Sequence, residues 1–273
     1  GVRYIYHENF KNHATPNVAL MYKPGKFNFR ASYAAGFRTP TLSELYATDI
    51  AKKNDRLTIG NLDLKPEKNN YFSLSAEYVH ERFSVSVNAF YNNIRDMIDY
   101  NTIATGDKAM EQYGHKEVRQ RDNIAEAKVH GINVSANAYL GAGFNLSGGY
   151  THLNTQDVEL EQPIDKSIKN AYNINAQWAH SWKIYRLNIN LNGRINSKRF
   201  SKSYGYAPEY QLWDLNTRHS FNLKSVIIEP GFGMENLFDY MDDRPYNSNY
   251  ATLTPGRSFY ISCLLYTSDA ADE

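Results

Sequence analysis

The sequence predicts an all-β protein, a transmembrane antiparallel β-barrel, because of its hydrophobic period, the length of its strands and the alternation of its loops. From residue 185 to residue 196, apolar or glycine positions alternate strictly with Arg and Asn, which is the pattern of a strand with two different faces. Most such segments reach ten residues or more. Soluble strands have about five or six residues, whereas a strand tilted across a bilayer needs about nine to eleven.

Counting these segments gives twelve expected strands, and almost no helix is expected. In chain order they cover residues 1–7, 16–22, 27–36, 69–80, 83–96, 121–140, 144–154, 170–180, 184–199, 209–220, 225–238 and 256–265. Their polar positions carry Asn, Ser, Gly and Gln more often than Lys and Glu, which suits a crowded, wet lumen with the apolar face toward lipid. A soluble β-sandwich would share the period, and strand length favours the barrel over it.

The connections between the expected strands alternate between short and long. The short ones cover residues 23–26, 81–82, 141–143, 181–183 and 221–224, and the long ones 37–68, 97–120, 155–169, 200–208 and 239–255. Outer-membrane barrels have short periplasmic turns and long external loops, so both ends of this chain are expected on the periplasmic side. Aromatic residues near strand ends would form the interfacial girdles: Tyr22, Trp178, Trp182, Tyr185, Tyr210 and Trp213.

Composition excludes several classes of protein. Lys and Arg number 30 against 29 Asp and Glu, which argues against a nucleic-acid partner. The single cysteine, Cys263, excludes a disulfide framework and a zinc site with two thiolates. Mean hydropathy is −0.61, and the longest apolar run, residues 18–22, is far too short for a spanning helix. No signal peptide is visible, and the chain starts in mid-pattern, so we expect a fragment.

Several motifs, in order along the chain, carry a family resemblance. Residues 29–40 read FRASYAAGFRTP and are followed by ELY at 44–46 and GNLDLKPE at 60–67. Three later matches are NIAEA at 123–127 leading to VHG at 129–131, ENLFD at 235–239, and PGRSF at 255–259. Their order and spacing resemble the barrel of TonB-dependent outer-membrane receptors over nearly the whole chain.

The resemblance implies a barrel of 22 strands occluded by an N-terminal plug. Residues 1–265 would be its C-terminal portion, so the plug and the segment that contacts TonB are absent from the chain. Residues 266–273 are acidic and Ala-rich where the family ends in an amphipathic strand, and we interpret them as a non-native tail. The implied location is the outer membrane of a Gram-negative bacterium. The implied partners are the TonB complex, reached through the missing plug region, outer-membrane lipid and a small-molecule chelate.

The expected function is energised uptake of a scarce nutrient, a ferric siderophore or similar metal chelate. Alternatives are a self-contained passive pore of twelve strands, a barrel-anchored surface protein, and a haem or cobalamin receptor of the same family. No enzyme is expected, because there is no G-x-S-x-G elbow and the G-x-G starts at 141–143 and 231–233 lack a third glycine. The histidines form no metal-spaced pair with one another or with Cys263, and no cofactor is expected.

The long loops supply the candidate ligand-binding residues, although a solvated charged loop would have the same composition. A cationic and aromatic group suits a carboxylate- or catecholate-bearing chelate. The candidates are Arg38, Tyr46, Tyr113, His115, Lys116, Arg119, Tyr246 and Tyr250. In the first loop, Thr41 could N-cap a short helix with Glu44 at the capping-box position, which would make Glu44 structural.

Two metal-related alternatives concern the same loops. Asp239, Asp242 and Asp243 could hold Ca²⁺, although adjacent acids in a hydrophilic loop usually do not. Haem receptors of the family place a histidine between the motifs that correspond here to residues 37–40 and 60–64, and this chain has none there. A chelate other than haem is therefore expected, with a Tyr46 phenolate or His115 left open as haem ligands.

Overall fold

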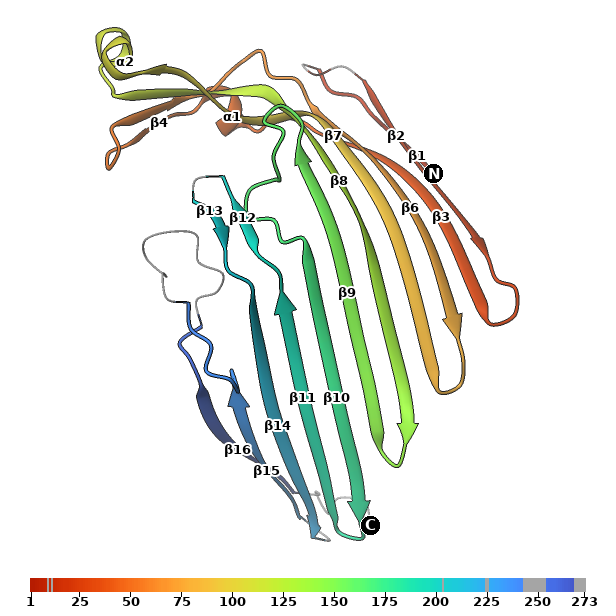
Figure 1. Cartoon of the computed structure of the whole chain (residues 1–273). Helices are drawn as coiled ribbons and strands as arrows, with labels where there is room; N and C mark the ends of the chain where they lie inside the picture. The colour runs from red at the N-terminus through yellow and green to blue at the C-terminus, as the bar shows by residue number, and fades with distance from the viewer. Residues whose placement is uncertain (9, 11, 203, 224–225, 243–253, 268–273) are drawn as a thin grey trace.

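A computed structural model describes residues 1–273 except 9, 11, 203, 224–225, 243–253 and 268–273. It shows one continuous, curved sheet with the shape of part of a barrel wall (Figure 1). Within the described residues, twelve strands follow one another in the order β1-β2-β3-β6-β7-β8-β9-β10-β11-β14-β15-β16, and every neighbouring pair is antiparallel. The all-β prediction is confirmed, and the barrel is not closed in this chain.

Each of the twelve expected strands is present. Their bounds are β1 (Val2–Ile5), β2 (His13–Tyr22), β3 (Phe27–Arg38), β6 (Glu67–Val79), β7 (Phe83–Thr105), β8 (Glu117–Gly141), β9 (Phe144–Asp157), β10 (Asn170–Trp182), β11 (Tyr185–Asn196), β14 (Tyr210–Leu223), β15 (Val226–Glu235) and β16 (Ser258–Thr267). Short turns join them at one end of the sheet, which we call the short-turn end, and longer excursions join them at the other, the long-loop end (Figure 1).

The register explains why the sheet has one polar and one apolar face. Asn190 lies opposite Asn216, whereas Leu191 lies opposite Leu215. Because side chains alternate along every strand, this pairing gathers most polar positions on one face and most apolar positions on the other. The apolar face remains open: Leu74 is 62% exposed and Ile132 is 43% exposed. No second layer of described residues covers it, so a β-sandwich is excluded and a lipid-facing wall fits.

Aromatic rings line the apolar face near the short-turn end. The ring centroids of Trp178 and Trp182 lie 6.1 Å apart, those of Trp182 and Tyr185 5.5 Å apart, and those of Tyr185 and Phe221 5.0 Å apart. The expected girdle position of Trp178, Trp182 and Tyr185 therefore coincides with a chain of packed rings. Such rings are typical of the boundary between hydrocarbon and water.

Three of the expected long connections contain regular structure: the short helix after Thr41 was expected, whereas the strands in these segments were not. Residues 37–68 contain α1 (Leu42–Tyr46), β4 (Thr48–Ala51) and β5 (Arg56–Ile59). Residues 97–120 are largely the ends of β7 and β8 with α2 (Gly106–Tyr113) between them, and residues 200–208 lie around the hairpin of β12 (Arg199–Ser201) and β13 (Gly205–Ala207). The period of two fails in β7 because its register shifts between Ile94 and Met97, which interrupts the alternation of faces.

At the C-terminal end, β16 continues to Thr267, which lies opposite Val226. The strand therefore includes the first two residues of the stretch interpreted as a tail, and residues 268–273 lie outside the described residues. Among the described residues, no helix has the length and apolar character needed to cross a membrane.

The outer edges of β1 and β16, which pair with no further strand in the part of the chain that the structure describes, generate the first prediction. The chain expressed by itself should give no discrete heat-modifiable band on gels, because two open edges favour aggregation in water and are costly in lipid. The full-length protein, refolded in the same detergent, is the control and should give one. A folded, heat-modifiable band from the isolated chain would instead support a self-contained pore of twelve strands.

Candidate ligand-binding site

The long-loop end carries a small folded unit, the outer lobe, which we define as residues 37–66 and 97–123. The ends of β7 and β8 bend away from the sheet and carry α2 and β4 with them (Figure 1). Leu57, Ala109 and Val118 form a buried cluster, and Tyr113 packs against it. Parallel pairing of β5 with β8 joins the two segments of the lobe. The lobe therefore has its own apolar centre, so its surface residues are held in defined positions.

Arg38 is the centre of an ion-pair network at the base of the outer lobe. Its guanidinium lies 2.9 Å from a carboxylate oxygen of Glu44 and 2.6 Å from one of Glu67, its cross-strand neighbour. Glu67 also accepts a hydrogen bond from the backbone N–H of Ile98 at 2.8 Å. One cation thus joins β3, α1 and β6, and through Glu67 also β7. Arg38 was a candidate ligand residue, but its guanidinium N–H groups donate to the carboxylates of Glu44 and Glu67.

Glu44 has the structural role that its spacing from Thr41 indicated. The Thr41 hydroxyl accepts the Glu44 backbone N–H, and the Glu44 carboxylate accepts the Thr41 backbone N–H at 2.8 Å, which completes a capping box. Partial burial raises the pKa of Glu44, but hydrogen bonds from Arg38 and Thr41 outweigh that effect and leave the pKa at about 2. Glu44 is therefore ionised at neutral pH.

Two residues of the family motifs hold the lobe to the sheet. The Gly60 backbone N–H donates to the carbonyl of Ala47, and a Cβ at Gly60 would lie 2.5 Å from the Leu45 carbonyl oxygen. Only glycine fits this approach of the chain to α1. The Asn123 side chain accepts the Lys65 N–H at 2.7 Å and donates to the carbonyls of Lys65 and Asp96. These contacts explain why glycine and asparagine stand at the two positions.

Asp55 joins the two segments of the outer lobe at its tip. Its carboxylate lies 2.9 Å from His115 Nδ1 and accepts the Lys116 backbone N–H at 3.3 Å. The hydrogen bond with His115 is the main reason that the pKa of Asp55 lies below its usual value. The charge of Lys116, an exposed residue, adds a smaller coulombic effect that also lowers the pKa of Asp55.

Four of the candidate ligand residues lie in one short segment of the outer lobe, and the others lie elsewhere. Tyr113 is the last residue of α2, His115 and Lys116 lie between α2 and β8, and Arg119, near the start of β8, pairs with Glu117. Tyr46, at the end of α1, is 66% exposed. Sequence reasoning missed Arg121, whose guanidinium carbon lies 3.6 Å from the centre of the Tyr100 ring. No spacing rule would have found this pair, because it depends on the register of β7 with β8.

The last candidate loop is described only in part. Asp239 accepts the backbone N–H of Arg257 at 2.8 Å, which gives its carboxylate a structural role. Tyr246, Tyr250 and Asp243 lie outside the described residues. Among the residues that are described, no group of three or more His, Cys, Asp or Glu side chains is placed to hold a metal ion.

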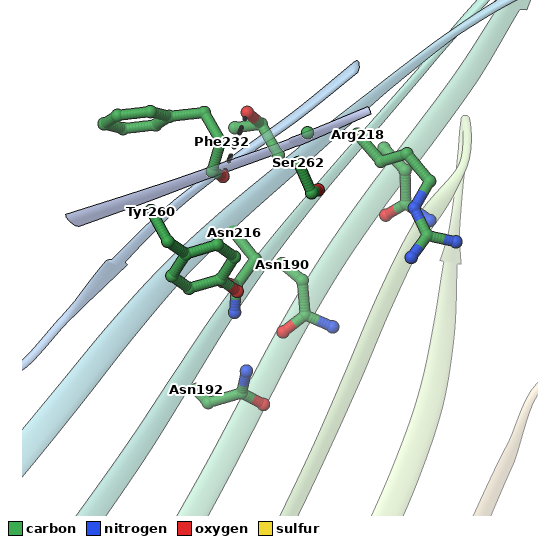
Figure 2. Close-up of a pocket in the computed structure, with 10 residues that line it drawn as sticks. Asn190, Asn192, Asn216, Arg218, Phe232, Tyr260 and Ser262 are labelled. Atoms are coloured by element: carbon green, nitrogen blue, oxygen red, sulfur yellow. Dashed lines mark hydrogen bonds between the residues drawn. The ribbon is translucent and has the colours of Figure 1, made fainter. Parts of the chain in front are cut away.

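Below the outer lobe, asparagine side chains line the polar face, and some of them form hydrogen bonds across strands. We define the Asn wall as Asn175, Asn188, Asn190, Asn192 and Asn216. Asn175 donates to Asn190 at 3.0 Å and to Asn192 at 2.6 Å. Figure 2 shows Asn190, Asn192, Asn216 and Tyr260 on the same side of the sheet, lining a pocket. The even positions of residues 185–196 were the sequence signal for this wall, but no residue in it was nominated.

Comparison with known proteins identifies this architecture. The family model described as "TonB dependent receptor-like, beta-barrel" matches residues 1–237. The chain belongs to this family. TonB-dependent receptors are transporters and not enzymes.

Solved receptors share the fold of this TonB-dependent receptor chain. The ferric enterobactin receptor PfeA of Pseudomonas aeruginosa matches 98% of the chain with a TM-score of 0.76 and 19% identity, over 42% of its own length. The siderophore receptor PirA of Acinetobacter baumannii matches 98% of the chain with a TM-score of 0.73 and 17% identity, over 43% of its length. The ferric preacinetobactin receptor BauA of Acinetobacter baumannii matches 94% of the chain with a TM-score of 0.65 and 18% identity, over 36% of its length. The chain thus spans less than half of each receptor.

The Arg38 network predicts a local loss of stability in Arg38→Met. The Glu44 and Glu67 side chains are only 14% and 15% exposed, so both carboxylates would lose their cation without gaining much water. We expect the outer lobe to be destabilised by roughly 1–3 kcal/mol, seen as faster hydrogen exchange of residues 39–66 in the full-length receptor. Arg30→Met on the same strand is the matched control. Equal exchange in both variants would show that the network does not hold the lobe.

The low pKa of Glu44 predicts an acid-sensitive outer lobe. A carboxylate whose pKa is lower in the folded state contributes stability above its unfolded pKa and loses it as the pH falls toward its folded pKa. Pepsin cleavage within residues 39–66 should therefore increase as the pH falls from 4.5 toward 2. The Glu44→Gln variant should be cleaved readily throughout this range. The Asp63→Asn variant, changed outside the network, should show the same increase in cleavage with falling pH as the unmodified receptor. A pH-independent rate in the unmodified receptor would contradict the assignment.

Proposed function

We propose that this chain is the C-terminal part of an outer-membrane receptor that imports a ferric siderophore or similar metal chelate, with energy supplied through TonB. The observation that carries the proposal is the ordered tip of the outer lobe, where Tyr113, His115, Lys116 and Arg119 lie close in the chain. Cationic and aromatic groups in a fixed frame suit an anionic chelate. Receptors for ferric enterobactin and ferric preacinetobactin share the fold, which supports this ligand class.

The polar face supports the same proposal by a separate route. The Asn wall offers donors and acceptors but carries no charge, and Arg218 at its margin is exposed. A hydrated chelate could exchange hydrogen bonds along such a wall without meeting a strong ion pair that would retain it. In this proposal the chelate first binds at the charged outer lobe and then passes along the uncharged amides of the Asn wall.

Contact with TonB, the plug and residence in the outer membrane belong to the proposal as well. Members of the family with known structures are outer-membrane barrels, and the open apolar face with its ring girdle is suited to lipid. A passive pore of twelve strands is the weaker alternative, because β1 and β16 lie at opposite edges of the sheet and do not pair.

The test is uptake of radioactive iron by cells that depend on the full-length receptor, with ferric enterobactin as the probe. Uptake should be saturable and abolished by a protonophore. Lys116→Gln/Arg119→Gln should weaken binding by about tenfold or more, since charged hydrogen bonds contribute about 1.5–3 kcal/mol each. Lys23→Gln/Lys26→Gln, at the short-turn end, is the matched control with the same loss of charge and should leave binding unchanged.

Haemin is the contrasting ligand in the same experiment. The full-length receptor should show no saturable Soret shift. A saturable shift at micromolar haemin, abolished by Tyr46→Ala or His115→Ala, would replace the siderophore proposal with haem uptake. Iron entry that persists with the protonophore would support the passive pore.

A further inference from the structure

The pocket of Figure 2 lies on the polar face where β11, β14, β15 and β16 run side by side. Its floor is flat because β15 carries glycine there: Gly231 lies opposite Arg218 on β14 and opposite Ser262 on β16. The next glycine of this face, Gly233, is covered by the Tyr260 ring, since a Cβ at Gly233 would lie 2.1 Å from Tyr260 Cζ. A hollow of about 390 Å³ remains beside the ring.

Three amides of the Asn wall that line this pocket already use their side-chain oxygens as acceptors. The bonds run from Gln177 to Asn188 at 3.3 Å, from Asn175 to Asn190 at 3.0 Å, and from the Tyr260 hydroxyl to Asn216 at 2.5 Å. The NH₂ groups of the three amides remain, and within the described residues they donate to no other group. The pocket therefore offers mainly hydrogen-bond donors.

Arg218 adds a positive charge to these donors. It lies opposite Asn188 and, unlike Arg38, forms no ion pair within the described residues. Arg186, the next residue of β11 on this face, lies diagonally across from Arg218 and is likewise in no ion pair in that part of the chain. Glu229, on the same face of β15, forms no ion pair with either. Two cations and one carboxylate leave the local charge positive.

The pocket lies toward the end of the polar face that is away from the outer lobe. Asn188 stands near the start of β11, at the short-turn end, whereas the lobe is attached at the long-loop end (Figure 1). Arg218 and Asn192 lie at opposite ends of the group labelled in Figure 2, with Asn190 and Asn216 between them. A ligand that leaves the outer lobe and follows the Asn wall would therefore meet Arg218 last.

We propose that this pocket is an exit-side subsite of the barrel wall, where anionic oxygens of the imported chelate, carboxylate or catecholate, bind before release at the short-turn end. Guanidinium and amide N–H groups donate to such oxygens, and the Tyr260 ring offers a flat surface to an aromatic group. A hollow of about 390 Å³ is near the lower limit for ligand sites, so it takes one edge of a chelate. The inference rests on the proposed function.

The test separates external binding from transport in cells that carry the full-length receptor, with ferric enterobactin as the probe. Binding is measured on de-energised cells, and uptake of radioactive iron on energised cells. Arg218→Gln should leave external binding unchanged and lower the maximal uptake rate by about tenfold, the effect of losing one charge-assisted hydrogen bond. Arg218→Lys should recover part of the rate. Arg30→Gln, which changes an exposed arginine on the polar face of β3, is the matched control and should leave both unchanged.

Asn190→Asp is a second variant that preserves the shape of the wall. The aspartate keeps an oxygen for the bond from Asn175 and replaces the donor NH₂ group with an anionic oxygen. It should lower the maximal uptake rate at least as much as Arg218→Gln. Asn133→Asp, on the polar face of β8, keeps the bond from Thr151 in the same way and should leave uptake unchanged.

Unchanged uptake in both pocket variants, or an equal loss in the two control variants, would overturn the proposal. Weaker external binding in Arg218→Gln would overturn it as well, because the residue would then act on the outer site. Faster hydrogen exchange of the plug in ligand-free Arg218→Gln would assign the pocket to a plug carboxylate instead. Normal uptake that does not depend on Arg218 rejects this inference alone, whereas no uptake by the unmodified receptor rejects the proposed function and the inference with it.

Discussion

Hydrogen bonding of the main chain between neighbouring strands is the constraint on which the structure depends. In a bilayer no water is available, so each backbone N–H and C=O must find a partner within the protein. Each strand pairs with the next along the path from β1 to β16, and the long strands follow from the thickness that they must cross. Along the path of twelve strands, the outer edges of β1 and β16 lack a strand partner among the described residues, which is why the sheet makes sense as part of a larger closed wall.

The same constraint explains the composition of the polar face. Neighbouring side chains on adjacent strands are about 4.5–5.5 Å apart, a distance that short polar groups can bridge. Ser32 and Ser73 do so at 2.7 Å, as do Ser86 and Ser135. Longer charged side chains would need counter-ions in a confined space, at a cost in desolvation. Short amides and hydroxyls can therefore satisfy one another between adjacent strands of this face.

The sequence predicted the sheet well because its evidence is local. Alternation over residues 185–196 locates β11 and assigns its faces with no knowledge of its neighbours. The outer lobe could not be predicted in this way. Its centre joins Leu57 to Val118 through parallel pairing of β5 with β8, a contact between residues far apart in the chain. A period of two gives no signal for such a contact.

Candidate site residues were affected by the same limit. Arg38 and Lys116 looked alike in the sequence as cations in long loops, but Arg38 lies opposite Glu67 and is held by two carboxylates, whereas the Lys116 side chain acts on Asp55 through a weaker coulombic effect. The motif supplied Thr41 and Glu44 correctly because a capping box is a local interaction over three residues. Contacts between side chains on different strands, by contrast, can be predicted only when the register of the two strands is known.

Register also separates the two faces of β6 near the long-loop end. Glu67 and Lys68 are consecutive residues of β6, and strand geometry turns them to opposite faces. Glu67 holds Arg38 and the Ile98 N–H at the base of the outer lobe, while Lys68 lies opposite Arg95 on the other face. A slip of one residue would place the carboxylate on the apolar face and the ammonium beside Arg38. The opposed charges at these two positions therefore favour the observed register by electrostatics as well as by hydrophobic pattern.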